Sequence, residues 1–118
     1  MNLYEFVFII RQDVSSTEVD RITSSIMEII TAMEGEIIKK EYRGLRTLAY
    51  QIKGNNKGNY MFIGMKASPE CLKELERKLS LSDFVIRHVV IKVKEISNEA
   101  SPILKSFNVD DASVNVTG

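Results

Sequence analysis

The sequence predicts an α+β domain with the ferredoxin-like split βαβ (βαββαβ) fold, a four-stranded antiparallel sheet with two helices on one face. Four segments are rich in β-branched and aromatic residues, and two others carry apolar residues at helical spacing. Their order along the chain is strand, helix, strand, strand, helix, strand. With 118 residues, 44% of them hydrophobic, the chain can bury one sizeable core.

The first half of the pattern consists of a strand and a helix. Residues 3–10 are predicted to form a central strand, because both of its faces are mostly apolar. A helix is predicted over residues 16–33, since Ser15 and Glu18 have capping-box spacing and apolar residues then recur every three or four positions. Gly35 is expected to take the left-handed conformation that ends this helix.

A hairpin follows the first helix. Residues 36–53 predict a long strand with a bend or bulge at Gly44, where glycine tolerates an irregular backbone. Residues 53–58, Lys-Gly-Asn-Asn-Lys-Gly, have the composition of a flexible basic loop. A third strand is predicted over residues 60–66.

The second helix begins at Ser68 and Pro69, because a hydroxyl caps the helix and proline suits its first position. Its apolar face repeats leucine, it ends within residues 80–83, and residues 84–93 form the fourth strand. No predicted element covers the second face of the sheet, so apolar residues left there would favour a binding partner.

The chain is predicted to divide into a ferredoxin-like domain, residues 1–95, and a flexible C-terminal tail, residues 96–118. The periodic apolar pattern stops at Ile96, and Ser, Asn and Asp dominate beyond it. An apolar spot that contains Pro102 and Ile103 is the expected docking point of this tail on a neighbour.

The charge of the chain is balanced overall but uneven along it. Sixteen basic and sixteen acidic residues give a formal net charge of zero, which argues against gripping nucleic acid by charge alone. Residues 1–35 carry six acidic and two basic side chains, whereas residues 36–58 carry six basic and two acidic ones. The middle of the chain is therefore the electrostatic candidate for contact with RNA.

The composition also indicates the cellular compartment in which the protein is expected. One cysteine, Cys71, allows no internal disulfide, which fits a reducing environment. No stretch approaches the roughly 18 apolar residues of a membrane span. The apolar N-terminal run lacks a basic start and reads as a strand and not as a signal peptide, so the cytoplasm is expected.

No constellation of residues for catalysis or for a metal is apparent, so no enzyme, no metal site and no cofactor are predicted. His88 is the only histidine, and no ligand set or nucleophile at a suitable spacing accompanies it. A structural or solvent-exposed role is favoured for His88, with RNA contact as the alternative. Residues 57–62 match an RNA-recognition motif only with their aromatics one residue out of register, which turns them to the wrong face.

The most informative segment is residues 44–53, Gly-Leu-Arg-Thr-Leu-Ala-Tyr-Gln-Ile-Lys, which mixes basic, apolar and aromatic residues in one strand. It closely resembles the signature of the bacterial family of the sixth small-subunit ribosomal protein. The start of the chain, Tyr4-Glu5 with an apolar strand and then residues 11–13, is similar to the start of that family. Residues 83–87 and 99–102 resemble two further family segments, and the resemblance reaches about residue 105.

The resemblance implies a structural constituent of the small ribosomal subunit. It implies binding to the central domain of small-subunit ribosomal RNA, together with the eighteenth small-subunit ribosomal protein, and location in the cytoplasm, in the ribosome. The candidate RNA-binding residues are Arg43, Arg46, Lys53, Lys57, Arg87 and His88. The candidate partner-binding residues are Leu48, Tyr50, Ile52, Pro102 and Ile103.

Some alternatives stay open. Strand alternation places Arg46, Leu48, Tyr50 and Ile52 on one face, but Tyr50 fits a core ring as well as a partner-facing one. Arg87 fits either an outward arginine paired with Glu5 or another acid, or a contact with RNA or a partner. The alternative function on the same fold is a small-molecule-binding regulatory domain, which would need a closed pocket with convergent polar groups.

Overall fold

The computed structural model describes residues 1–96 and contains the predicted elements in the predicted order. They are β1 (Asn2–Arg11), α1 (Ser16–Ala32), β2 (Glu36–Ile52), β3 (Asn55–Ala67), α2 (Pro69–Leu81) and β4 (Val85–Val93). The strands form one antiparallel sheet in the order β2-β3-β1-β4, so β1 is central, as its two apolar faces predicted. Except for Ile96, the predicted tail lies outside the described residues, and the predicted boundary at residue 95 stays a prediction.

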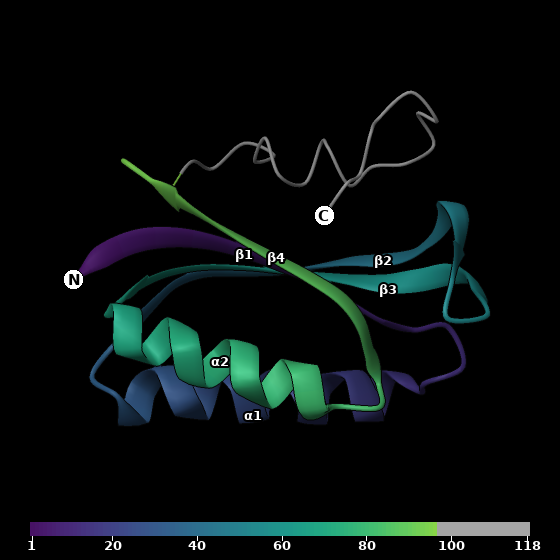
Figure 1. Ribbon diagram of the computed structural model, residues 1–118, viewed down its shortest axis with the longest axis horizontal. Coiled ribbons are helices and arrows are strands. Elements are labelled where there is room, and N and C mark those ends of the chain that lie inside the picture. The colour runs from purple at the N-terminus through teal and green to yellow at the C-terminus, as the bar shows by residue number, and fades with distance from the viewer. Residues whose placement is uncertain (97–118) are drawn as a thin grey trace.

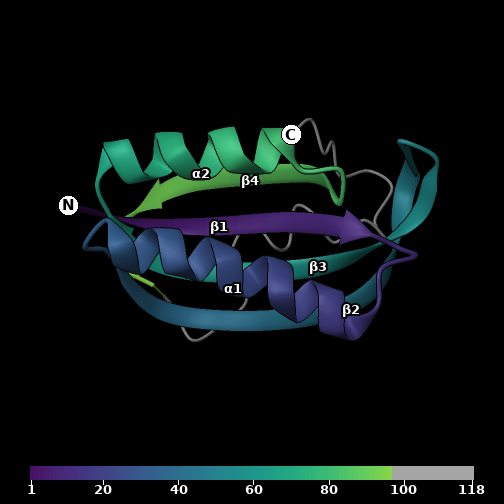
Figure 2. The same cartoon turned by 90° about the horizontal axis from the view of Figure 1, so that it is seen from below.

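Both helices lie on one side of the sheet (Figures 1 and 2). Ser15 and Ser68 cap them as predicted, because each hydroxyl accepts a hydrogen bond from the amide three residues later, at 3.2 Å. Within the described part of the chain, neither helix is long and apolar enough to cross a membrane.

The end of α1 differs from the prediction. The left-handed residue is Glu34, with φ of 65°, and not Gly35. Glycine is needed at position 35 for a different reason, which is space. A Cβ there would lie 2.8 Å from Ile30 Cγ2 and 2.9 Å from the backbone oxygen of Lys66, so no larger residue fits between α1 and β3.

The β2–β3 connection also differs from the prediction. The predicted six-residue loop is a two-residue turn at Lys53 and Gly54, and β3 already begins at Asn55. Both turn residues have positive φ, 48° and 82°, as in the hairpin turns that match strand twist. The Asn55 side chain stabilises the turn, donating to the carbonyls of Ile52 and Lys53 at 3.2 and 3.1 Å.

The two faces of the sheet carry different clusters. Side chains facing the helices form the larger core, including Phe6, Phe8 and Met65. Alternate residues point to the other side, which we call the open face. There Val7, Ile9, Tyr60, Phe62, Leu48 and Ile86 form a second buried cluster. Among residues 1–96, no helix covers the open face (Figure 1), which leaves it as the candidate binding surface.

Candidate functional site

A large irregularity in β2 shapes the open face. Thr47 pairs with Lys57 and Ile52 with Asn55, so the four residues between Thr47 and Ile52 face the single residue Asn56. These extra residues leave the ladder of hydrogen bonds, as in a special bulge with more than one extra residue, and the hairpin end twists out of the sheet plane (Figure 1). The bulge therefore carries the middle of the signature segment, Leu48 to Gln51, out of the sheet plane.

Tyr50 in this bulge meets Arg87 of β4. The Nη1 atom of Arg87 donates to the Tyr50 hydroxyl at 3.0 Å, and the guanidinium carbon lies 5.7 Å from the ring centroid. Since β2 and β4 are the two edge strands, the contact spans the whole sheet. Tyr50 is 49% exposed, so it is not a core ring.

Of the alternatives left open for Arg87, a pair with Glu5 is not formed. Arg87 lies opposite Ile9 on β1, whereas Glu5 lies opposite Ile91, and no ion pair joins Arg87 to Glu5. Arg87 donates to the hydroxyl of Tyr50, and its pairing with another acid stays a prediction.

The other two predicted partner residues on the hairpin are less accessible. Leu48 is 7% exposed and packs in the second cluster, and Ile52 is half-buried against the same cluster. They line, with Ile9 and Tyr60, a cavity beneath Tyr50 of about 10 Å³, room for about one water molecule. Leu48 and Ile52 therefore anchor the bulge on the second cluster. Of the three predicted partner residues on the hairpin, Tyr50 is the most exposed.

The two predicted arginines of β2 are held in place by neighbours. Arg43 sits at a register shift beside Gly44, whose φ is 87°, which confirms the predicted bulge there. The Nη2 atom of Arg43 lies 3.3 Å from Glu41 Oε1, and Lys39 Nζ lies 3.5 Å from the same oxygen. Arg46 Nε donates to the Arg43 carbonyl at 3.1 Å. One carboxylate in this row of β2 side chains thus holds two cations, Lys39 and Arg43, in place.

Lys39 and Glu41 belong to this row, although the sequence analysis did not single them out. Lys39 Nζ lies 5.6 Å from the centre of the Phe62 ring, on the open face. The alternation of Lys39, Glu41 and Arg43 at every second residue was the signal that could have shown them to share a face.

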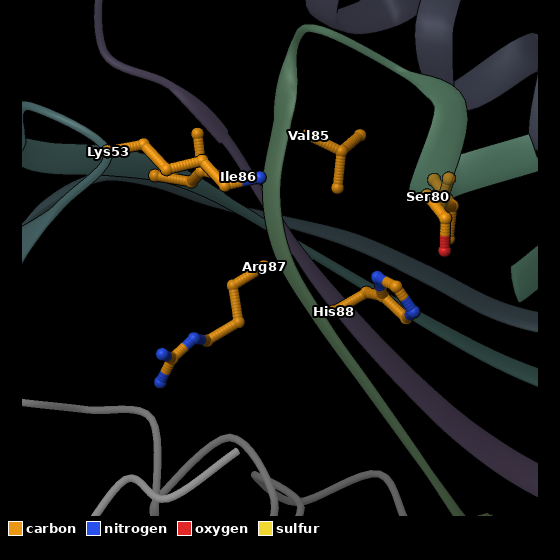
Figure 3. A pocket seen from close by; sticks show the side chains of 7 residues that line it. Lys53, Ser80, Val85, Ile86, Arg87 and His88 are labelled. Atoms are coloured by element: carbon orange, nitrogen blue, oxygen red, sulfur yellow. The ribbon is translucent and has the colours of Figure 1, made fainter.

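The remaining basic candidates lie at the rim. Lys53 lines an open hollow of about 330 Å³ together with Arg87, His88 and Ser80 (Figure 3). The backbone amide of Lys57 donates to Gln12 Oε1 at 3.2 Å, and its side chain is exposed. Alternation along β3 places Lys57 on the helix side of the sheet, away from Arg87.

His88 lines the same hollow as Arg87 but projects to the other side of β4. The two side chains leave β4 in opposite directions (Figure 3), and the imidazole lies 6.3 Å from the Phe6 ring, edge to face. Burial lowers the pKa of His88, Glu76 opposes that effect, and Lys53 adds to it. The imidazole is therefore neutral at pH 7, and its predicted contact with RNA stays a prediction.

The geometry of residues 1–96 gives little support for a metal site or a reactive cysteine. In residues 1–96, no three His, Cys, Asp or Glu side chains are grouped to hold a metal ion. Cys71 is buried, and burial raises the pKa of its thiol, which suits an unreactive core residue. Pro102 and Ile103, the predicted docking point of the tail, lie outside the described residues.

Comparison with known proteins decides the family. The family model described as "Ribosomal protein S6" matches residues 3–92. The chain belongs to the ribosomal protein S6 family. It is 49% identical over 114 residues to "Small ribosomal subunit protein bS6" of Rickettsia rickettsii (strain Sheila Smith), which covers 97% of this chain and 94% of that protein. It is 46% identical over 114 residues to the protein of the same name from Rickettsia bellii (strain OSU 85-389), over 97% and 95% of the two chains.

A solved structure agrees with this assignment. The crystal structure of the 30S ribosomal protein S6 from Thermotoga maritima aligns with a TM-score of 0.74 at 31% identity, over 78% of this chain and 87% of that one. The chain is thus a non-enzymatic component of the small ribosomal subunit, where ribosomal RNA is its partner, and it lies in the cytoplasm within the ribosome. The resemblance of residues 44–53 therefore identified the family correctly.

Proposed function

We propose that this ribosomal protein S6 family member binds the central domain of small-subunit ribosomal RNA as one half of a heterodimer with the eighteenth small-subunit ribosomal protein. The observation that carries the proposal is the Arg87–Tyr50 pair on the open face. It sets a guanidinium against a half-exposed aromatic ring, and RNA-binding proteins use both groups, the cation for phosphate and the ring for unstacked bases.

The charges on the open face support contact with RNA. Arg43 and Lys39 share one carboxylate, and Arg46 and Arg87 are held by neutral oxygen acceptors. These bonds hold the four side chains in defined positions. Preorganised cations bind phosphate at a smaller cost in side-chain entropy than free lysines would.

The balance of charge supports the partner. A chain with a formal net charge of zero releases few counterions when it binds RNA, so its affinity alone is expected to be low. A second protein that adds basic side chains next to the open face would supply the electrostatic affinity for RNA that this chain lacks. Tyr50, which is half-exposed, and the partly buried Val89 and Ile91 at the edge of the second cluster offer that protein apolar contacts.

The test measures binding to a central-domain RNA fragment by this chain alone, by the eighteenth protein alone and by both together. We expect tight binding only for the pair. Arg87→Gln should weaken binding by the pair about tenfold or more and reduce the slope of log affinity against log salt by about one. Tight, salt-insensitive binding by the isolated chain would defeat the partner-dependent proposal.

Arg77→Gln is the matched control for Arg87→Gln. Arg77 is an exposed arginine on α2, on the other side of the sheet, where it pairs with Glu74 at 2.6 Å. The same loss of charge there should leave RNA affinity unchanged. An equal loss from both variants would mean that net charge, and not the Arg87 site, determines binding.

A further inference from the structure

A buried acid on the open face has no role in the site described so far. Glu5 lies in the middle of the central strand β1 and is 2% exposed. Strand alternation puts it on the same face as Val7 and Ile9, both members of the second cluster. Carboxylates are rarely buried so completely unless they are paired.

The surroundings of Glu5 are apolar. Its neighbours across the sheet are Gly64 on β3 and Ile91 on β4. Ile96 occupies the space over Gly64, because a Cβ built on that glycine would lie 2.8 Å from Ile96 Cγ2. The nearest cross-strand neighbours of the carboxylate are therefore apolar, and Lys66 and Lys39 lie farther away on the same face.

The carboxylate of Glu5 is incompletely satisfied. Its Oε1 atom is buried and has no hydrogen-bond partner among the described residues. Lys66, which the register places diagonally from it on β3, forms no ion pair with it within 4.0 Å. A buried carboxylate without a partner costs several kcal/mol unless a cation or donors reach it. The Oε1 atom therefore lacks the hydrogen-bond donor that a buried carboxylate oxygen normally has.

We infer that Glu5 receives an arginine or lysine side chain from the protein that docks on the open face, and that the two form a buried ion pair. The inference rests on the proposed function in taking that protein to be the heterodimer partner. An RNA phosphate is excluded as occupant, because it would repel the carboxylate. A metal ion would need further ligands, and residues 1–96 group none around Glu5.

The approach to Glu5 is blocked by a residue that can move. Ile96 follows the end of β4 and takes no part in the strand pairing of the sheet, so displacing its side chain breaks no ladder hydrogen bond. Segments of this kind open at a low free-energy cost. The docking protein would replace Ile96 over Gly64 and set its cation against the carboxylate.

Glu5 and Arg87 divide the open face between two kinds of partner. Arg87 lies opposite Ile9, four residues along β1 from Glu5, which is about 13 Å at the usual rise of a strand. The cation-rich end beside the hairpin suits RNA, and the position of Glu5 suits a basic protein.

The experiment measures the affinity of the full chain for the eighteenth protein by calorimetry, without RNA. Glu5→Gln keeps the shape and removes the charge, and Glu5→Met removes polarity as well. Each should weaken binding by about thirtyfold or more, the lower end for truncating one member of a buried charge pair. Glu36→Gln, an exposed acid on the same face, is the matched control and should bind like the wild type.

The unfolding of the free variants separates a binding role from a structural one. The stability of Glu5→Met should be unchanged or higher, because an unpaired buried charge is lost. If either variant instead loses stability and affinity together, the carboxylate is already paired inside the chain and the inference is wrong.

Each remaining outcome is also decisive. If the wild type fails to bind the eighteenth protein, the proposed function fails and takes the inference with it. If the wild type binds and both Glu5 variants bind equally well, the inference alone is overturned. Replacing each arginine and lysine of the partner by methionine should reveal one residue whose effect is non-additive with Glu5→Gln, and a purely additive set would contradict the ion pair.

Discussion

Gly58 lies against Ile9 and near Leu48, which belongs to the bulge of residues 48–51. Replacing Gly58 by alanine tests how tightly this region is packed. A Cβ on Gly58 would lie 2.2 Å from Ile9 Cγ2. Carbon atoms pack at about 3.5–4.0 Å, so the overlap exceeds about 1 Å. Ile9 cannot easily yield, since it is β-branched, 1% exposed and enclosed by the second cluster.

The magnitude follows from two opposing effects. Overpacking a core costs about 1–3 kcal/mol, and the enclosed position of Ile9 favours the upper part of that range. Replacing glycine by alanine returns about 0.4–1 kcal/mol by restricting the unfolded chain. We therefore expect Gly58→Ala to lower the free energy of unfolding by about 1.5–2 kcal/mol, or the Tm by roughly 6–16 °C.

Urea unfolding at equilibrium is the assay, with Ile9→Ala as the second arm. Because Ile9→Ala removes the clashing methyl group, the double variant should lose less stability than the two single variants together. Gly54→Ala is the control, since a Cβ there meets no atom within 4 Å and its cost arises from a φ of 82° alone. A loss below about 0.5 kcal/mol for Gly58→Ala, or strict additivity with Ile9→Ala, would refute the packing argument.

Three further predictions concern the hairpin and β4. Lys53→Asn should raise stability by about 0.5 kcal/mol in urea unfolding, because asparagine tolerates the φ of 48° better than lysine, while RNA affinity falls with the lost charge. Asn59→Ala should cost about 1–3 kcal/mol, since its buried amide donates to the Arg11 carbonyl at 2.8 Å and accepts from the Tyr42 hydroxyl at 2.6 Å; an unchanged urea midpoint would contradict this. His88 has a lowered pKa when folded, so the unfolded chain binds its proton first and stability falls as the pH drops from about 7 toward 5. His88→Gln should flatten that dependence, and urea midpoints measured at several pH values would show whether it does.

Much of the fold could be predicted because local signals agreed with the tertiary structure. The serine caps, the alternation in β1 and the glycine at position 44 each specify a feature through the residue that carries it. Gly35 was misjudged because its role is space against Ile30, which involves a contact that no local pattern shows.

The two-residue turn of the predicted hairpin could not be foreseen for a similar reason. Its composition is that of a loop, but tertiary hydrogen bonds decide its structure. Asn55 Oδ1 accepts from the backbone amide of Gln12, and the side chain of Gln12 accepts from the amide of Lys57. These bonds tie the hairpin to the end of β1 and extend β3 to Asn55.

The candidate site was predicted in its residues but not in its geometry. Leu-Ala-Tyr-Gln is good strand sequence and contains no glycine or proline to mark a bulge. The bulge arises from the mismatch in length between β2 and β3, which depends on where β3 begins. Without it, Tyr50 on one edge strand could not have been placed beside Arg87 on the other.

The Tyr50–Arg87 contact also bears on folding. It joins residues 37 apart in sequence and lies across all four strands, so it can form only after both edge strands have joined the central pair. A chain whose β4 or hairpin has frayed lacks the pair, even if its helices and β1 are native. The RNA binding proposed for this face would therefore report completed folding, and a nascent subunit would select finished chains over partly folded ones by affinity alone.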